Sequence, residues 1–435
     1  MITYLYNNSK ENVLGTNVYQ LRTFRGEKVV NKVTVLKNGI VLTPIREIHD
    51  GVVLIEGEKI KTLGTRAQVK IPAEAEIIDV NGAYISPGFI DLHLHGAWGG
   101  DVITGSEQDL LTMSEGLVRG GATAFLPTTL SGPLKQITKA VECIQGTMKK
   151  ELPGAKILGA HLEGPYFNMS QKGAQNPAYI IRPQPEDYLP LLDTYSCIKR
   201  VSAAPELPGA LELGQELKHR QIVASIAHSD ATYQEILTAI ENGYTHVTHI
   251  YSGMSGVRRV SAYRVTGVIE SVLLLNELTT EMIADGHHLP PSLMRLVLKT
   301  KGLDKVCLVT DSMAAAGLGP GQYDLGGLKV IVESDIPEAF EIPTEERNYV
   351  AKLTDRSAFA SSVATMDQLV RNMVKYVGLN IADAIKLVTI NPARMQCLEK
   401  EIGVLAEGMK ADVTVFDQEI NIKMTMVDGK IKFKA

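Results

Sequence analysis

Residues 89–96 read FIDLHLHG, a short apolar segment that ends in two histidines and a glycine. Seven further apolar runs follow, most of them with a polar or titratable residue near the end. They are ATAFLPTT (122–129), KILGAHLEG (156–164), IKRVSAAPE (198–206), QIVASIAHS (221–229), HVTHIYS (246–252), EMIADGHH (281–288) and KVCLVTDS (305–312). Helix-like segments separate these runs, and such alternation is typical of repeated βα units with a parallel sheet.

Eight strands of this kind predict an α/β protein with a (β/α)8 barrel of the TIM type. The runs lie within residues 89–312, which fits the size of such barrels, and each of the seven connections has room for a helix or a crossover. A doubly wound sheet is the second interpretation. It usually has a glycine-rich phosphate turn after its first strand, and no such turn follows Ile90 in the sequence.

The two ends of the chain share a different sequence pattern, that of short β-strands joined by tight turns. Residues 33–82 and residues 402–433 contain short alternating strand patterns separated by Asn-Gly and Asp-Gly turn pairs. We therefore expect both ends to pair in one small β-sandwich domain, made of residues 1–85 and 400–435. The barrel then occupies residues 86–399.

Two segments fit neither domain well. Residues 1–32 have weak patterning, and the sequence assigns them no role. Residues 333–360 are polar and rich in turn residues, so we expect an insertion near the mouth of the barrel.

Composition excludes several classes of function. The 435 residues are 45% hydrophobic and 21% charged, and the formal net charge is −5 from 44 basic and 49 acidic side chains. This balance gives no basic field for nucleic acid or an anionic membrane. The sequence shows neither a secretory signal nor an apolar run long enough to span a bilayer, so we expect a cytoplasmic protein. Its four cysteines form no CxxC pair, which argues against disulfides and thiolate zinc sites.

The first strand carries the first candidate metal ligands. His93 and His95 are two residues apart, so both side chains point to the same side of a strand. They stand at its carboxyl end, where barrels of this type have their active sites. Two imidazoles in this arrangement suit one metal ion, although a lone pair of this kind equally well caps a strand without binding metal.

Three further candidates end other strands, and their arrival at the same rim favours metal binding. Zn²⁺ takes imidazole nitrogen and carboxylate oxygen, and a catalytic site uses three protein ligands with one open position. Glu163, His228 and His249 supply such a set. His93 and His95 could then hold a second ion, with Glu163 bridging. The sequence thus predicts one or two divalent ions per subunit, with zinc the first choice.

Asp311 follows the apolar run 306–309, where a carboxylate is costly without a charged partner. We interpret it as the catalytic base, and the alternative is a cap for the following helix. His161 has the parity of Glu163 but lies one layer deeper, so we assign it to packing, and His246 is also predicted to be structural.

Six of these segments resemble, in order, the N-acetylglucosamine-6-phosphate deacetylase family of the amidohydrolase superfamily. They are FIDLHLHG, HLEGPYFN, AHSDATY, THIYSGMSG, ADGHH and LVTDSMAAAG, and the closing GVLAEGMKADVTVFD continues the match. The resemblance covers nearly the whole chain after its first thirty residues. It implies a distorted barrel with a β-sandwich built from both chain ends, and a homodimer whose partner loop completes the phosphate site.

The resemblance also implies roles for single residues. Glu163, His228 and His249 are implied to bind the catalytic metal. Asp311 is implied to be general base and acid, and His288 to contact the sugar.

One loop departs from the family pattern. Family members commonly read HLYNAM, a short loop and REPG, whereas this chain reads HIYSGMSGVRRVSAYRVTG. Ser252 and Gly253 replace the usual Asn-Ala, and Arg264 takes the place of the family arginine in a longer loop. The resemblance makes all three substrate-binding residues, and the altered loop, residues 252–267, leaves open whether a 6-phosphate is required.

The expected reaction is removal of acetate from N-acetylglucosamine 6-phosphate or a close N-acetylhexosamine phosphate. A deacetylase of a non-phosphorylated N-acyl sugar and a dihydropyrimidinase-like cyclic amide hydrolase are alternatives. Many cyclic amide hydrolases bridge two metals with a carboxylated lysine on the fourth strand, but Lys199 stands at the start of that strand. A non-catalytic barrel scaffold would have lost metal ligands, and here every expected position is filled.

Overall fold

Parallel β-strands form the centre of the protein. The computed structural model describes residues 32–334, 341–343, 346 and 348–435. One parallel sheet has six strands in chain order: Ala160–Glu163 (β11), Ile198–Ala203 (β12), Val223–Ile226 (β13), Tyr244–Val247 (β14), Thr279–Ile283 (β17) and Val306–Val309 (β18). A second parallel sheet has the order β10-β9-β6 and consists of Phe89–Leu94 (β6), Ala122–Pro127 (β9) and Lys156–Ile157 (β10).

Single parallel bridges connect the two sheets at both edges. Leu94 pairs with Ser312 just beyond β18, and Thr128 just beyond β9 pairs with His161 on β11. All eight predicted strands are present, and the predicted α/β class is confirmed. The strands succeed one another in chain order from β6 to β18, and the bridge at Leu94 leads back to β6.

The third predicted strand is divided in two. Its first part, β10, pairs with β9, and its second part, β11, pairs with β12. Gly159 lies between them with a φ of 151°, and a Cβ there would lie 2.5 Å from the Cys197 carbonyl oxygen and 2.4 Å from the Lys199 side chain. The strand therefore changes partner at a position where only glycine fits.

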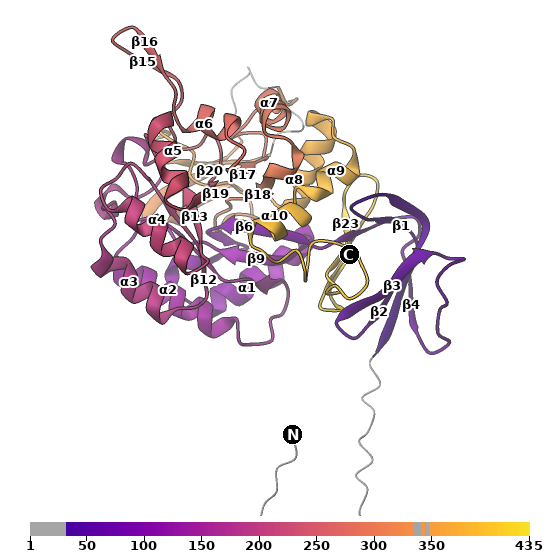
Figure 1. Ribbon diagram of the computed structural model, residues 1–435. Helices are drawn as coiled ribbons and strands as arrows, with labels where there is room; N and C mark the ends of the chain where they lie inside the picture. Colours follow the sequence, from indigo (N-terminus) through magenta and orange to yellow (C-terminus); the bar gives the residue numbers. More distant parts are fainter. Residues whose placement is uncertain (1–31, 335–340, 344–345, 347) are drawn as a thin grey trace, which may run out of the picture. The chain divides into compact units, whose positions relative to one another are not determined.

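Helices follow the strands and lie outside them, as Figure 1 shows for α1 to α5. In α2, Ile137, Val141 and Ile144 follow helical spacing and are buried. A capping box of Thr232 and Glu235 starts α5. The α-helices are Glu107–Leu117 (α1), Leu134–Thr147 (α2), Pro185–Thr194 (α3), Ala210–His219 (α4), Tyr233–Glu241 (α5), Val268–Leu274 (α6), Pro291–Lys301 (α7), Met366–Asn372 (α8), Ile381–Lys386 (α9) and Ile390–Met395 (α10). None of the helices in the described residues is long and apolar enough to cross a membrane.

The two ends of the described chain meet in one sheet of eight strands. Its order is β24-β23-β22-β5-β1-β2-β3, with β4 paired to β1. Its buried side chains form a core of their own, which includes Leu36, Val53, Ile85 and Val413. The strands are Val33–Leu42 (β1), Glu47–Glu56 (β2), Lys59–Thr65 (β3), Glu76–Asp79 (β4), Tyr84–Pro87 (β5), Val413–Phe416 (β22), Ile422–Val427 (β23) and Lys430–Lys434 (β24).

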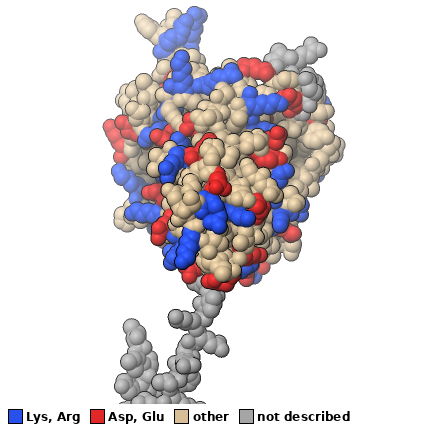
Figure 2. Space-filling view, turned by 90° about the vertical axis from the view of Figure 1, so that its right-hand side faces the viewer, with Lys and Arg blue, Asp and Glu red and all other residues tan. Residues whose placement is uncertain are grey.

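The predicted pairing of the two chain ends is thus present as one sheet. The domain boundaries of the prediction stay a prediction, and residues 1–31 lie outside the described residues. Figure 2 views the molecule from the side that carries this sheet in Figure 1, and lysines and arginines alternate there with carboxylates. This mixed surface agrees with the near-balance of charge in the sequence.

Two inserted β elements lie beyond the parallel strands. A three-stranded sheet consists of Gly321–Leu325 (β19), Leu328–Glu333 (β20) and Val350–Leu353 (β21), and it packs through Leu325 and Val330 against Leu130 and Met313. A hairpin of Arg258–Val260 (β15) and Tyr263–Val265 (β16) projects from the protein in Figure 1. The predicted insertion at 333–360 overlaps β21, and its residues 335–340, 344–345 and 347 lie outside the described residues.

The break in the third strand gives a stability prediction. Gly159→Ala should lower the free energy of unfolding by about 1–3 kcal/mol, because the Cβ meets a backbone oxygen at a positive φ. Gly146→Ala is the matched control, since a Cβ at this position in α2 meets nothing within 4 Å. The control should be neutral or stabilising by up to about 1 kcal/mol. Urea denaturation of both variants measures the difference, and equal stabilities would contradict the proposed constraint.

Candidate active site

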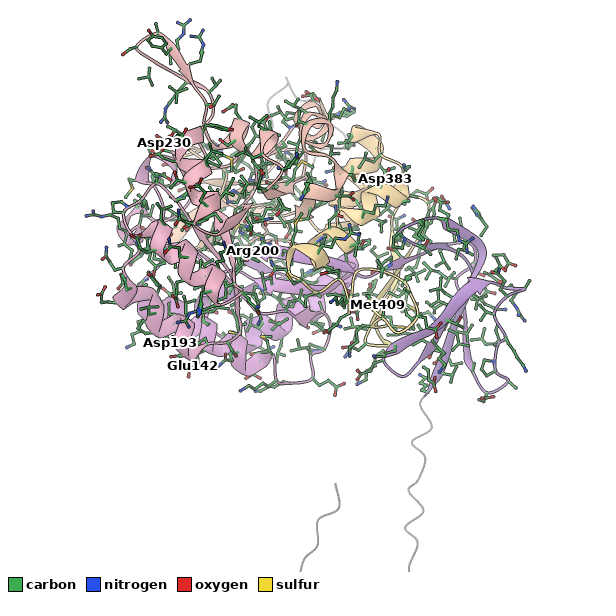
Figure 3. All side chains as sticks on the ribbon, in the orientation of Figure 1. Glu142, Asp193, Arg200, Asp230, Asp383 and Met409 are labelled. Atoms are coloured by element: carbon green, nitrogen blue, oxygen red, sulfur yellow. The ribbon has the colours of Figure 1, made fainter. Side chains whose placement is uncertain are left out.

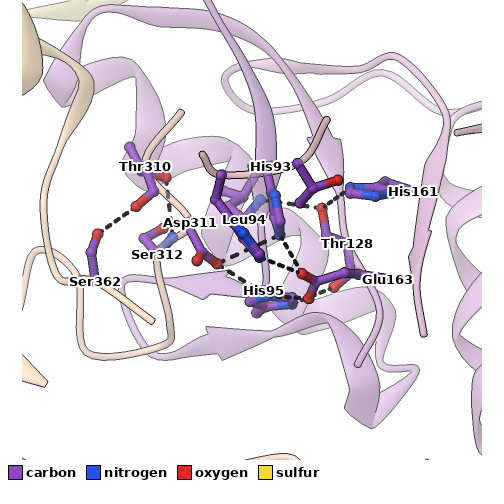
Figure 4. A network of polar contacts seen from close by, with 12 residues as sticks. His93, Leu94, His95, Thr128, His161, Glu163, Thr310, Asp311, Ser312 and Ser362 are labelled. Atoms are coloured by element: carbon purple, nitrogen blue, oxygen red, sulfur yellow. Dashed lines mark hydrogen bonds and ion pairs between the residues drawn. The ribbon is translucent and has the colours of Figure 1, made fainter. Parts of the chain in front are cut away.

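Buried titratable side chains converge at the carboxyl ends of the parallel strands. Each is at most 7% exposed to solvent. Figure 4 shows four of them from close by, namely His93, His95, Glu163 and Asp311. The full cluster consists of His93 and His95 on β6, Glu163 on β11, His228 after β13, His249 after β14 and Asp311 after β18.

Glu163 is the centre of a first group of candidate ligands. Its Oε1 lies 2.9 Å from His249 Nε2 and 3.3 Å from His228 Nε2. One possible ligand atom from each of the three residues lies within 4.8 Å of the others. The structure therefore brings together the three residues that the sequence suggested as one metal-binding set.

The same carboxylate also belongs to a second group. His95 Nε2 lies 3.3 Å from Glu163 Oε2, and His93 Nε2 lies 3.6 Å from Glu163 Oε1. The ligand atoms of these three residues also lie within 4.8 Å of one another. Glu163 stands between the two groups, which is the position that a bridging ligand needs.

The donor set fits a divalent cation. His93 Nε2 is buried without a hydrogen-bond partner, although two carboxylates lie within 3.6 Å of it. Buried polar atoms normally have a partner, so a nitrogen that faces two carboxylates without a hydrogen bond suits the binding of a cation at this point. Imidazole nitrogens together with carboxylate oxygens are the ligands that Zn²⁺ and related ions take.

Charge compensation inside the cluster shifts several pKa values. Burial would raise the pKa of Glu163, but the His93 charge and hydrogen bonds from His228 and His249 lower it well below its usual range. Burial would lower the pKa of His95, yet hydrogen bonds with Asp311 and Glu163 raise it to about 9. The carboxylates are therefore ionised at neutral pH and can accept protons or bind cations.

Asp311 is held beside both histidines of β6. Its Oδ1 lies 3.1 Å from His95 Nε2 and 3.5 Å from His93 Nε2. Its backbone N–H donates to the His93 carbonyl at 2.8 Å, and its own carbonyl accepts from the Ser362 N–H at 2.8 Å. Burial would raise the pKa of Asp311, but the His93 charge and the His95 hydrogen bond lower it. An ionised carboxylate thus faces the cluster from the last strand.

Three of the cluster residues have a left-handed backbone. His228 has a φ of 45°, His249 of 27° and Asp311 of 46°. Non-glycine residues in this region cost of order 1 kcal/mol each, and they persist where the surrounding structure imposes them. Each lies two residues beyond the end of a parallel strand, so the chain takes an unfavourable conformation at the positions where these side chains reach the cluster.

Two residues that the sequence did not single out hold the candidate catalytic groups. Gln175 donates from Nε2 to Glu163 Oε2 at 2.8 Å and accepts from the Ser131 N–H at 2.8 Å. Asp285 accepts a hydrogen bond from His288 Nδ1 at 2.8 Å. Burial would raise the pKa of Asp285, but the His288 charge lowers it to about 2. The segment ADGHH contained a signal for Asp285, whereas nothing in the sequence pointed to Gln175.

A cavity of about 290 Å³ opens above the cluster. His95 and Asp311 lie on its walls together with His288, Ser252 and Gly253, the last three being residues to which the resemblance assigned contact with the substrate. An apolar wall stands beside these polar groups. It consists of Leu130, Leu325, Ala358 and Phe359, of which Leu325 ends β19 and the last two follow β21.

The altered loop of residues 252–267 divides into two parts. Gly253 lines the cavity with a φ of 56°, and a Cβ there would lie 2.6 Å from His228 Nδ1. The alanine of the family pattern would therefore not fit here without a shift. Arg264 lies on the projecting hairpin, where it is exposed and donates to the Ala262 carbonyl. Arg264 is not among the residues that line the cavity of its own chain.

The two histidines that the sequence assigned to structural roles, His161 and His246, have polar partners within the protein. His161 Nε2 lies 2.7 Å from Ser202 Oγ, and His246 Nδ1 lies 2.7 Å from Thr279 Oγ1. Both are at most 1% exposed, and neither lines the cavity. Their places agree with the structural roles inferred for them.

Comparison with known proteins relates this cluster to a family. A model of the amidohydrolase family matches residues 84–432. The chain belongs to the amidohydrolase family. An N-acetylglucosamine-6-phosphate deacetylase from Lysinibacillus sphaericus is 30% identical over 380 residues, which cover 86% of this amidohydrolase and 92% of the relative. An N-acetylgalactosamine-6-phosphate deacetylase from Escherichia coli O157:H7 is 30% identical over 361 residues, 83% and 90% of the two chains.

The fold of this amidohydrolase is also similar to solved structures. The crystal structure of N-acetylglucosamine-6-phosphate deacetylase from Pasteurella multocida superimposes with a TM-score of 0.82 at 28% identity. The superposition covers 92% of this chain and 99% of the Pasteurella multocida chain.

The raised pKa of His95 predicts how the metal-free amidohydrolase responds to pH. A folded-state pKa of about 9, against 6.5 for a free imidazole, stabilises the fold fully below pH 6.5 and less as the pH rises toward 9. The pKa values of Glu163 and Asp311 are lowered, so their contribution is already present above about pH 4.5 and stays constant in this range. The melting temperature of chelator-treated protein should therefore fall between pH 6.5 and 9.

Zinc should reverse this trend, because the ion binds neutral imidazole and its affinity rises with pH. Differential scanning fluorimetry with and without Zn²⁺ measures both trends. His95→Asn is the matched variant and should show a smaller decline without metal. A flat melting temperature across this range in the metal-free wild-type protein would contradict the interpretation.

Proposed function

We propose that this amidohydrolase removes the acetyl group from N-acetylglucosamine 6-phosphate, or from a close N-acetylhexosamine phosphate. The products are acetate and the amino sugar phosphate. The observation that carries the proposal is the convergence of two histidine pairs and two carboxylates in one cluster beside one cavity. Relatives at 30% identity that are named as deacetylases of such sugars support the same reaction.

We also propose that the protein consists of a (β/α)8 barrel and a small β-sandwich domain. The bridges at Leu94 and Thr128 and the strand order support the barrel, and the sheet shared by both chain ends supports a small β domain built from them. We assign residues 86–399 to the barrel and residues 1–85 and 400–435 to the sandwich. The location that we propose for the enzyme is the cytoplasm.

Glu163, His228 and His249 are the proposed ligands of the catalytic ion, and His93 and His95 are those of a second ion that shares Glu163. Zinc is the proposed metal, because imidazole and carboxylate are its usual ligands and these carboxylates are ionised. A bound ion of this kind activates water and polarises an amide carbonyl.

Asp311 is the proposed acid and base. Its carboxylate lines the cavity, and the lowered pKa keeps it ionised, so that it can accept the proton from the attacking water. It then gives the proton to the departing nitrogen, because an amine leaves far more easily than its anion. Burial lowers the pKa of His288, but the Asp285 charge and its hydrogen bond to Nδ1 raise it above its usual value. The protonated ring can then donate from Nε2 to the carbonyl oxygen as negative charge develops there.

Substrate recognition is proposed to involve two copies of the chain. Ser252 and Gly253 line the cavity, whereas Arg264 lies on a hairpin that projects away from the protein. The hairpin exposes apolar surface, since Tyr263 is 78% and Val260 51% exposed. We infer a homodimer in which this hairpin contacts the second copy and brings Arg264 toward its phosphate site.

A cyclic amide hydrolase has weaker support. Lys199 is exposed at the start of β12, and no lysine in the described residues lines the cavity. The sugar epimer is a closer alternative, because relatives named for the glucosamine and the galactosamine phosphate are equally similar to this chain.

A panel of N-acetylated sugars tests the substrate. We expect acetate release from N-acetylglucosamine 6-phosphate or its epimers to exceed release from the unphosphorylated sugars by tenfold or more, since a charge-assisted contact contributes about 1.5–3 kcal/mol. Arg264→Ala should raise KM for the phosphorylated sugar and leave the slow reaction of the free sugar unchanged. Equal rates on phosphorylated and free sugars would reject the phosphate assignment.

Asp311→Asn tests the proton transfer. The amide cannot carry a proton, so kcat should fall by about 10²–10⁴-fold while the metal content stays the same. Single-turnover acetate release and elemental analysis give the two quantities. Near-normal turnover at saturating metal would remove Asp311 from this role.

A further inference from the structure

A second charged cluster is buried inside the barrel beneath the candidate metal ligands. Arg200 on β12, Glu281 on β17 and His246 on β14 are 0%, 0% and 1% exposed. Figure 3 labels Arg200 in the interior, among the parallel strands. A guanidinium and a carboxylate buried together usually give little net stability, because their desolvation offsets their attraction. Their presence below the active site therefore points to a role other than stability.

The Glu281 carboxylate contacts both groups of candidate metal ligands. Its Oε1 lies 2.5 Å from His93 Nδ1 and accepts from the His249 backbone N–H at 3.3 Å. Its Oε2 accepts from Arg200 Nη1 at 2.5 Å and lies 3.4 Å from His246 Nε2. One side chain thus joins His93 of the second group to His249 of the first.

This arrangement determines which nitrogen of His93 is free. A carboxylate bound to a guanidinium can only accept, so His93 Nδ1 must carry the proton that it donates. When the ring is neutral, as an imidazole that binds metal must be, His93 Nε2 then presents its lone pair, and it faces Glu163 Oε1 at 3.6 Å and Asp311 Oδ1 at 3.5 Å. Hydrogen bonds of this type orient imidazole ligands in metal sites.

Arg200 is itself held from behind. When the amide oxygen of Gln396 faces the guanidinium, it accepts from Nη2 at 2.9 Å and from Nε at 3.2 Å. The arginine side chain has hydrogen-bond donors only, so Glu281 must accept from it and stays ionised. Gln396 therefore fixes Arg200, Arg200 fixes the Glu281 carboxylate, and Glu281 in turn accepts the hydrogen bond from His93.

We propose that Glu281, held by Arg200, is a positioning residue that sets His93 Nε2 as a metal ligand and couples the two metal-binding groups. The proposal rests on the proposed function only in that the cavity binds divalent ions. It makes no use of the identity of the substrate.

Glu281→Gln is the first test. The amide has one acceptor, and Arg200 would take it, so the amide N–H would face His93 Nδ1 and force the proton to Nε2. We expect the Zn²⁺ affinity of the site that includes His93 to fall by about 10–100-fold. Titration of the metal-free full-length protein against a chromophoric chelator measures it. Unchanged affinities overturn the proposal, whether the wild-type protein binds one ion or two.

The double variant Arg200→Met with Glu281→Gln separates positioning from packing. Without the guanidinium, the amide oxygen introduced by Glu281→Gln is free to face His93, so the double variant should regain much of the affinity that the single variant loses. A merely structural role would make the double variant bind zinc no better than the single one. The non-additivity of the two changes gives their coupling.

Asp412→Asn is the matched control for a lost buried ion pair. Asp412 is 5% exposed and pairs with Lys156 at 2.8 Å, and neither residue lines the cavity. Loss of this ion pair should change the melting temperature and leave zinc affinity unchanged.

Arg200→Lys is the second variant, for use if Glu281→Gln does not fold. It keeps the positive charge but loses the contacts to Gln396, so it should weaken zinc binding by a smaller factor. Wild-type zinc affinity in Arg200→Lys would then overturn the proposal. Zinc affinity is independent of the sugar panel, so failure of the deacetylase proposal would be seen separately.

Discussion

The burial of the Glu163 carboxylate is the constraint on which the rest of the site depends. This side chain is 1% exposed, and four imidazoles from three different strands or strand ends approach its two oxygens. An isolated buried carboxylate is very unfavourable, so the fold must deliver these positive or metal-binding groups to one point. The parallel strands do this by ending at the same rim, and three left-handed residues complete the approach.

Behind this cluster, most of the important side chains are held by another polar group. Gln175 holds Glu163, Asp285 holds His288, and Glu281 holds His93. Such contacts place the reacting groups before substrate arrives, which is the condition for effective electrostatic and acid–base catalysis. They also explain why the interior of the barrel tolerates so many buried polar residues.

Insertions beyond the parallel strands supply part of the cavity wall. The three-stranded sheet supplies the apolar wall of the cavity through Leu325, and the loop after it adds Phe359. The hairpin carries Arg264 away from its own cavity, while Gly253 allows the loop to approach His228 closely. If the proposed function is correct, substrate choice depends on these segments, while the candidate metal ligands lie at the strand ends.

The sequence by itself determined the eight parallel strands and the polar residues that cluster near their carboxyl ends. Strand periodicity of two places His93 and His95 on one side, and the barrel pattern places Glu163 and Asp311 at the same rim. Only the tertiary structure decided that Glu281 contacts His93, that the third strand divides at Gly159, and that Arg264 lies outside its own cavity. Local periodicity fixes the face on which a side chain lies. Contacts between residues as far apart as 188 positions depend on how strands align across the barrel.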